Sequence, residues 1–374
     1  MASHLLLLVN AKPQLTASIA KVQSTVPEQN MLAVFLEKSP IHPGPMGVAV
    51  FFLISGLLIP LSLQRLYVRQ FAIARIFRII PTYAGCLLIT ISVLTLIHFL
   101  TNQPYDLKWS HAVAHFLMIR DFLWIAPIDG VVWTLEVEVK FYILCALLAP
   151  LILQGQWQRI LLLNFMVTAL TVWLGKVSFP FNQENMRWYA AMNSFYLTCM
   201  CLNYLWCGVA FYWHLSGQIT ARALLLCTVL FNAMLVVQVQ MNHISTPVTV
   251  TSYVGGLVLF AFGYLNSDWK WDRNRLINWI ADISYPLYLV HAAIGYGLIH
   301  ALHGVGLPVW LAVLAAIGLA VMIAQIVHLL IEKPCQVYGK YLAKLATPRH
   351  EMPQAICELV IDAELGTRSQ TSAA

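Results

Sequence analysis

Apolar runs long enough to cross a lipid bilayer recur along nearly the whole chain, and they exclude an ordinary soluble fold. A transmembrane helix needs about 20 predominantly apolar residues, and we count roughly ten such segments if a partial first one is included. Hydrophobic residues make up 60% of the 374 positions and charged residues only 10%, against about 25% charged residues in soluble domains. The sequence therefore predicts an all-α protein, a polytopic transmembrane bundle of about ten helices with the first one incomplete.

The predicted segments are separated by polar connections. The apolar residues 5–9 are too few to span a membrane and predict the second half of a helix, followed by an external loop over the proline-containing residues 10–45. Further segments are expected near residues 46–63, 79–100, 132–153, 160–174, 195–213, 223–238, 248–265, 276–300 and 308–331. We predict one membrane-embedded domain over residues 1–335 and a short polar cytoplasmic tail over residues 336–374.

Lysine and arginine gather in alternate connections, for example at residues 65–78 and 270–275. Loops rich in these residues stay in the cytoplasm during membrane insertion, so both chain termini are expected to be cytoplasmic. The same rule explains the net charge of +6, so this charge does not indicate a nucleic-acid partner. Membrane lipid is the expected partner of the apolar surface. The 8 cysteines form no metal-ligand pattern, so no metal site is expected.

The stretch Trp133–Tyr142 is unusual because it places two carboxylates and one ammonium at the entrance of an apolar segment. Each ionisable group at the bilayer centre costs roughly 2.5–3.5 kcal/mol on insertion scales, so such groups are paired or functional. On a helix, Glu136 and Lys140 are four residues apart and predict an interfacial ion pair. Glu138 has no such neighbour, and we interpret it as the better functional candidate.

Three arginines precede the segment 79–100. They are Arg69, Arg75 and Arg78, and the last two share one face of a helix. Guanidinium groups suit bidentate contact with phosphate. Anionic lipid headgroups are the alternative ligand for the same cluster.

The histidines fall into three groups. His4 would lie near the middle of the bilayer if about ten helical residues preceded it, at 1.5 Å per residue, and an imidazole there can take a proton from a hydroxyl nucleophile. His291 lies near the middle of an apolar segment, where an imidazole is more often functional or paired than idle. His111 and His115 have the i, i+4 spacing of metal ligands, but no third ligand is near, and we predict ordinary outer-loop residues.

Five motifs, in sequence order, resemble those of the acyltransferase 3 family of integral-membrane acyltransferases, over about residues 1–335. The matching positions are Phe51, Phe52, Ser55 and Gly56; Arg75, Arg78, Pro81 and Tyr83; Trp133, Thr134, Leu135, Glu138, Phe141 and Tyr142; Ile283, Ser284, Tyr285, Tyr288 and His291; and Glu332 with Pro334. The family also has a basic residue upstream of an essential histidine in its first helix. His4 matches that histidine, the basic residue has no counterpart, and His42 is the alternative position for the histidine.

The resemblance implies transfer of an acyl group, usually acetyl from acetyl-CoA, to a hydroxyl of a glycan or lipid-linked sugar in a bacterial inner (plasma) membrane. His4 would be the general base, and Glu138 would orient an imidazole or bind acceptor hydroxyls. Arg75 and Arg78, with Arg69 beside them, would hold the phosphates of CoA. The remaining candidates would bind substrate or line its cavity: Ser55, Trp133, Tyr142, Ser284, Tyr285 and His291.

Two other functions fit the same residues. A transporter or flippase for a lipid-linked sugar would also place Glu138, His291 and Arg78 inside a bundle, but it would move substrate without consuming acyl-CoA. A truncated, non-catalytic family member acting as a scaffold or sensor is the second alternative, because the chain starts too late to include the basic residue of the first helix.

Overall fold

The computed structural model describes residues 3–27, 39, 41–182, 186–241, 250–266 and 274–346, a part of the chain that contains helices and no strands. The all-α prediction is confirmed for it. The chain begins with a π-helical turn at Ser3–Leu8 (η1), followed by α1 (Val9–Ala11) and α2 (Pro13–Ala20). The prediction of a loop from residue 10 onward is therefore wrong as far as Ala20. Pro13 starts α2, and at a first helical position its missing N–H leaves no hydrogen bond unmade.

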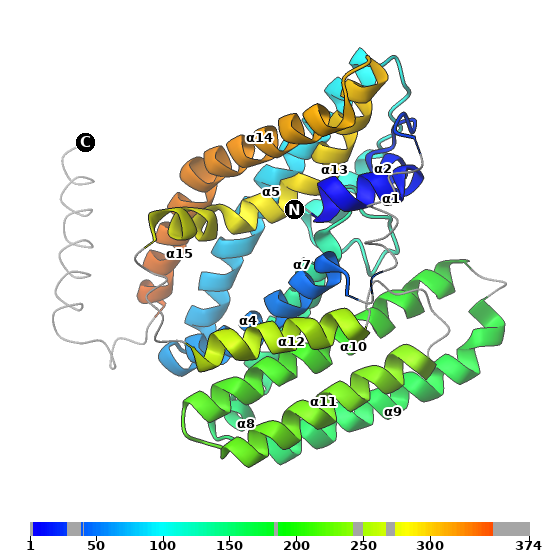
Figure 1. Cartoon of the computed structure of the whole chain (residues 1–374). Coiled ribbons are helices and arrows are strands. Elements are labelled where there is room, and N and C mark those ends of the chain that lie inside the picture. The colour runs from blue at the N-terminus through cyan, green and yellow to red at the C-terminus, as the bar shows by residue number, and fades with distance from the viewer. Residues whose placement is uncertain are drawn as a thin grey trace, which may run out of the picture.

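Most of the helices that follow run back and forth in one bundle (Figure 1). They are α4 (Pro43–Arg65), α5 (Val68–Leu100), α7 (Val132–Leu147), α8 (Ala149–Leu153), α9 (Trp157–Asn182), α10 (Met186–Leu215), α11 (Ala221–Met241), α12 (Val250–Leu265), α13 (Arg275–Gly304) and α14 (Val309–Val327), which continues through a π-helical turn (η3, His328–Glu332) into α15 (Lys333–Leu345). Among the described residues, 6 helical stretches are long and apolar enough to cross a membrane. The boundary predicted after residue 335 falls inside α15.

Successive long helices alternate in direction, so the bundle has two ends. Helices α4, α8, α10, α12 and α15 finish at one end, whereas α1 and α2 lie at the other (Figure 1). We name the first the basic end, because it carries Arg65, Arg69, Arg159, Arg222, Arg275, Lys340 and Lys344. We name the other the opposite end. The basic connections recognised in the sequence thus gather on one side of the molecule.

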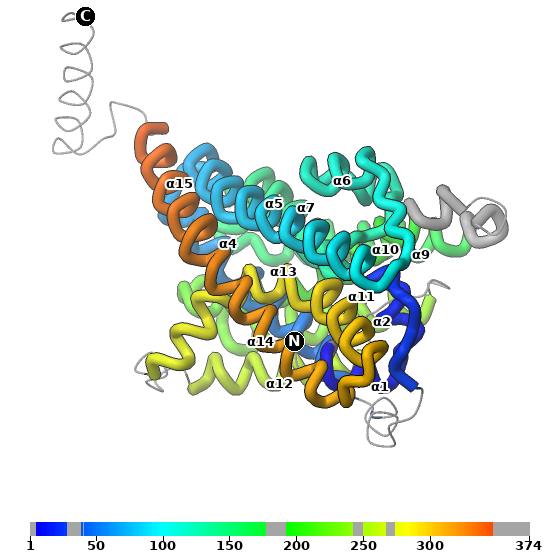
Figure 2. Tube along the Cα trace, turned by 90° about the horizontal axis from the view of Figure 1, so that it is seen from above, coloured from blue at the N-terminus to red at the C-terminus, as the bar shows by residue number. Residues whose placement is uncertain are grey.

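A short helix, α6 (Trp109–Phe116), lies beside α5 at the opposite end (Figure 2). The sequence predicts His111 and His115 as loop residues, but both lie in this helix. His115 is fully buried: its Nδ1 lies 2.7 Å from the carbonyl oxygen of His111, and its Nε2 accepts the backbone N–H of Ile128 at 3.1 Å. Burial lowers the pKa of His115 to about 4. The neutral ring therefore ties α6 to the loop that leads into α7.

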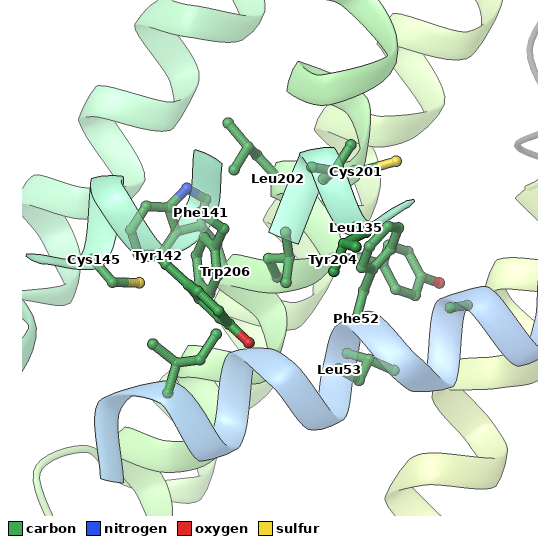
Figure 3. Close-up of a cluster of buried hydrophobic side chains, with 14 of the residues drawn as sticks. Phe52, Leu53, Leu135, Phe141, Tyr142, Cys145, Cys201, Leu202, Tyr204 and Trp206 are labelled. Carbon is green, nitrogen blue, oxygen red and sulfur yellow. The ribbon is translucent and has the colours of Figure 1, made fainter. Parts of the chain in front are cut away.

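The core between α4, α7 and α10 is built from large side chains (Figure 3). The rings of Phe141 and Trp206 meet edge to face, with centroids 5.3 Å apart. Helices α4 and α10 cross at Gly56 and Gly208, and a Cβ added to Gly56 would lie only 2.1 Å from the carbonyl oxygen of Leu205. Small residues permit such close helix contact in membranes. This crossing fixes α4 against the rest of the bundle.

Candidate active site

A cavity of about 1270 Å³ extends between α4, α5, α7 and α13, from the basic end to the N-terminal helices. Ordinary small-molecule sites have roughly 300–1,000 Å³, so this cavity has room for two substrates. Its walls bring together most of the site residues predicted from sequence, namely Ser55, Arg75, Arg78, Trp133, Glu138, Tyr142, Ser284, Tyr285 and His291.

Glu138 is the buried carboxylate of the cavity wall. Its Oε1 accepts hydrogen bonds from Ser55 Oγ at 3.0 Å and from the Tyr142 hydroxyl at 2.6 Å. Tyr142 reaches it because residues four apart share a helical face. Ser55 reaches it because the neighbouring Gly56 brings α4 close to the core. The carboxylate is thus held in one position, between a hydroxyl of its own helix and a hydroxyl of α4.

Two arginines line the cavity near its basic end. The guanidinium of Arg75 lies over the rings of Phe71 and Tyr142, 5.2 and 5.1 Å from their centroids, and donates to Ser62 Oγ at 2.5 Å. Contact with two ring faces stabilises a guanidinium and fixes its plane. Arg78 is exposed and follows one turn later on the same wall. Arg69 is exposed and lies outside the set of residues that line this cavity.

Histidines occupy the part of the cavity farther from the arginines. His291 Nδ1 lies 2.8 Å from the carbonyl oxygen of Tyr288 and 3.2 Å from that of Leu287. In a neutral ring the proton is therefore on Nδ1 and the lone pair on Nε2. His42 also lines the cavity, and its backbone N–H donates to Ser252 Oγ at 2.8 Å. His4 belongs to η1, but its side chain lies outside the described part of the structure.

The ion pair predicted between Glu136 and Lys140 is wrong. Glu136 is bound by Arg120, whose Nε donates to Glu136 Oε1 at 2.7 Å and whose Nη2 bonds the other oxygen. Lys140 is bound to the Asp121 carboxylate and donates to Thr198 Oγ1 at 3.2 Å. Both partners come from the loop between α6 and α7, which folds over the side of α7 and supplies charges closer than the neighbours on the helix.

Tyr288 is a cavity residue that the sequence interpretation left without a role. Its hydroxyl lies 2.7 Å from Thr134 Oγ1, and its ring stacks on Phe51 at 6.3 Å between centroids. All three side chains line the cavity. The sequence spacing could have indicated this position, because Tyr285, which was predicted to line the cavity, and Tyr288 are three residues apart and share a helical face.

A family model described as an acyltransferase domain matches residues 10–329. Searches of curated proteins and of solved structures returned no match. The match covers most of the chain, including the apolar helices and the cavity between them. The chain belongs to the acyltransferase 3 family and is an integral membrane acyltransferase.

Proposed function

We propose that the cavity transfers an acyl group, acetyl in the first instance, from acyl-CoA to a hydroxyl group of a glycan or lipid-linked sugar. One observation carries this proposal: Arg75, Arg78 and Glu138 line the same cavity, which continues to the opposite end of the bundle. A donor at the basic end and an acceptor at the opposite end can therefore meet inside the membrane. The basic end is then the cytoplasmic one, in a bacterial inner membrane.

The donor is held by charge. CoA carries several phosphates, and guanidinium groups bind phosphate with paired hydrogen bonds. Arg75 uses a donor on Ser62 and keeps others, since a guanidinium has five N–H groups. Arg78 is exposed on the same wall. Low dielectric around the cavity strengthens both contacts relative to bulk water.

The reaction is the attack of an acceptor hydroxyl on the thioester carbonyl. The new bond joins the hydroxyl oxygen to the acyl carbon, the carbon–sulfur bond breaks, and CoA leaves as its thiol. His4 is the proposed general base, which takes the hydroxyl proton and returns it to the sulfur. The turn that carries His4 packs on α13, where Leu5 lies against Gly295, one turn beyond His291. Glu138 binds acceptor hydroxyls or orients an imidazole.

Binding and transfer of radiolabelled acetyl-CoA test the proposal, with the purified protein and a membrane extract as the source of acceptor. We expect His4→Ala to bind acetyl-CoA and to abolish transfer, and Arg78→Ala to weaken binding by about tenfold, the loss expected for a charged contact of about 1.4 kcal/mol. Arg69→Ala is the matched control, because this arginine lies off the cavity, and it should bind normally.

Other outcomes point elsewhere. Full transfer by His4→Ala would assign the base to His42 or His291. Absence of CoA binding in every form would overturn the acyltransferase cycle for this chain. Movement of a lipid-linked sugar across vesicles without acyl-CoA consumption would then support the transporter alternative.

A further inference from the structure

The side chain of Tyr288 connects three helices that form walls of the cavity, α4, α7 and α13, at one level along its length. Its hydroxyl bonds Thr134 Oγ1 on α7, and the Thr134 hydroxyl in turn contacts the carbonyl oxygen of Val131 at 3.1 Å. Its ring stacks on Phe51 of α4 with an interplanar angle of 10°. The ring of His291, one turn farther along α13, lies 5.8 Å away. The tyrosine therefore extends from α13 across to both α4 and α7.

The directions of the helices show what lies on each side of this level. Helices α4 and α7 run toward the basic end, and α13 runs away from it. Cavity-lining residues that follow Phe51 in α4 or Thr134 in α7 therefore lie between Tyr288 and the basic end. Those that precede Tyr288 in α13 lie on the same side. They include Ser55, Arg65, Glu138, Tyr142, Ser284 and Tyr285.

The opposite side of the level has a different set of residues. Lining residues before Phe51 and Thr134, and those after Tyr288, face the N-terminal helices. They include His42, Gly130, Val131, His291 and Tyr296. All three helices give the same division, so the level of Tyr288 separates an arginine-lined part of the cavity from a histidine-lined part.

We propose that Tyr288 forms a waist in the cavity and determines how large an acyl group the enzyme accepts. This inference rests on the proposed function, in which acyl-CoA occupies the basic part with its acyl group leading. The thioester then reaches the waist, and the acyl chain must pass the tyrosine ring. Stacking on Phe51 and the bond to Thr134 hold the ring from two sides, so it does not rotate freely out of the passage. Acetyl fits, and longer chains meet the ring.

The test uses two readouts on the purified full chain. The first is binding of non-hydrolysable thioether analogues of acetyl-, butyryl- and hexanoyl-CoA, and the second is CoA released during transfer to acceptors of a membrane extract. A pocket changed by one methylene alters discrimination by roughly 10–200-fold. We therefore expect Tyr288→Ala to raise the preference for hexanoyl over acetyl by at least about tenfold.

Tyr288→Phe is the matched control, because it keeps the ring and removes only the hydroxyl. It should keep the chain-length preference of the native protein, because stacking on Phe51 still holds the ring in the passage. Tyr288→Leu, which keeps an apolar side chain on α13, replaces the alanine variant if that variant does not fold, and it should shift the preference in the same direction.

The outcomes separate this inference from the proposed function. Analogue binding with an unchanged chain-length preference in the alanine and leucine variants would overturn the waist and leave the acyltransferase cycle intact. No analogue binding by the native protein would overturn both. A shift as large in Tyr288→Phe as in Tyr288→Ala would assign the effect to the hydroxyl and contradict a steric waist.

Discussion

The two faces of α7 each carry a buried glutamate, but the two glutamates have different partners. On the face turned to the α6–α7 loop, Glu136 is bound by Arg120 through both carboxylate oxygens. On the cavity face, two residues later, Glu138 is bound by two hydroxyl groups, those of Ser55 and Tyr142. Both carboxylates are buried, with exposed fractions of 4% and 7%. What distinguishes them is the partner: a fixed cation on one face and neutral hydroxyls on the other.

The difference shows how one helix can carry a charge-compensated carboxylate on one face and a carboxylate bound by hydroxyls on the other. A buried carboxylate with its own arginine is compensated and has little to offer a ligand. A carboxylate that accepts hydrogen bonds from neutral hydroxyls keeps its charge available to a ligand in the cavity, while its position is fixed. Folding and acyl transfer, measured on the same variants, distinguish the roles of the two faces.

The largest effect is expected from Arg120→Ala. It leaves Glu136 buried without its cation, and removing one partner of a buried pair costs about 3–5 kcal/mol of stability. Equilibrium unfolding in mixed detergent micelles measures the loss. The double variant Arg120→Met with Glu136→Leu should recover most of it, because no charge is left buried. If Arg120→Ala were as stable as the native protein, the Arg120–Glu136 ion pair would not be what stabilises this face of α7.

Glu138→Gln should separate activity from stability. The amide oxygen still accepts from Ser55 and Tyr142, so the unfolding transition should stay close to that of the native protein. The negative charge is lost, and we expect acyl transfer to fall by about 100-fold or more, as for loss of a group that assists proton transfer. Initial rates with radiolabelled acetyl-CoA provide the measurement. Transfer at the native rate would remove Glu138 from the chemistry.

The contact between α6 and the loop that leads into α7, which depends on neutral His115, should make the folded protein less stable in acid. The pKa of His115 is about 4 in the folded protein, below the ordinary 6.5, so between these values the unfolded chain binds more protons and stability falls as the pH decreases. At pH 5.5 the loss relative to pH 7 is about 1.2 kcal/mol. Unfolding measured at both pH values tests this. In His115→Gln that increment should disappear, whereas in His111→Gln it should persist.

The smallest effect is expected from Ser55→Ala. It removes one of the two hydrogen bonds that fix Glu138 and leaves the one from Tyr142. A typical hydrogen bond contributes about 1 kcal/mol, so transfer should fall roughly fivefold with little change in acyl-CoA binding. Equal losses in the rate and in CoA affinity would indicate that Ser55 contacts the donor instead.

Much of this architecture could be predicted from the sequence, since apolar segments of membrane length specify helices wherever they occur. Many residues of the family motifs line the same cavity, because within each motif the spacing follows helical periodicity. The partners of Glu136 and Lys140 could not be predicted in this way. Spacing on one helix suggests neighbours four residues apart, whereas Arg120 and Asp121 come from a loop whose path depends on tertiary packing.

The N-terminal region shows a second limit of the sequence. Prolines there suggested a loop, yet Pro13 starts α2, and Leu15 and Ile19 of that helix line the cavity. His98 of α5 and His300 of α13 hold this region: His98 Nε2 lies 2.8 Å from the carbonyl oxygen of Lys21, and His300 Nε2 lies 3.1 Å from Thr16 Oγ1. Such long-range contacts carry no local signal in the sequence.

The crossing of α4 and α10 has a mechanical consequence. A Cβ on Gly208 would lie 2.4 Å from the carbonyl oxygen of Leu53, so the two backbones touch, and sliding or rolling one helix over the other would drive them into each other. Ser55, the residue before Gly56, therefore keeps a constant depth in the membrane. The α4 side of the cavity is thus held rigidly against α10, whereas the α13 side contains Pro286 inside its helix, a residue at which helices kink.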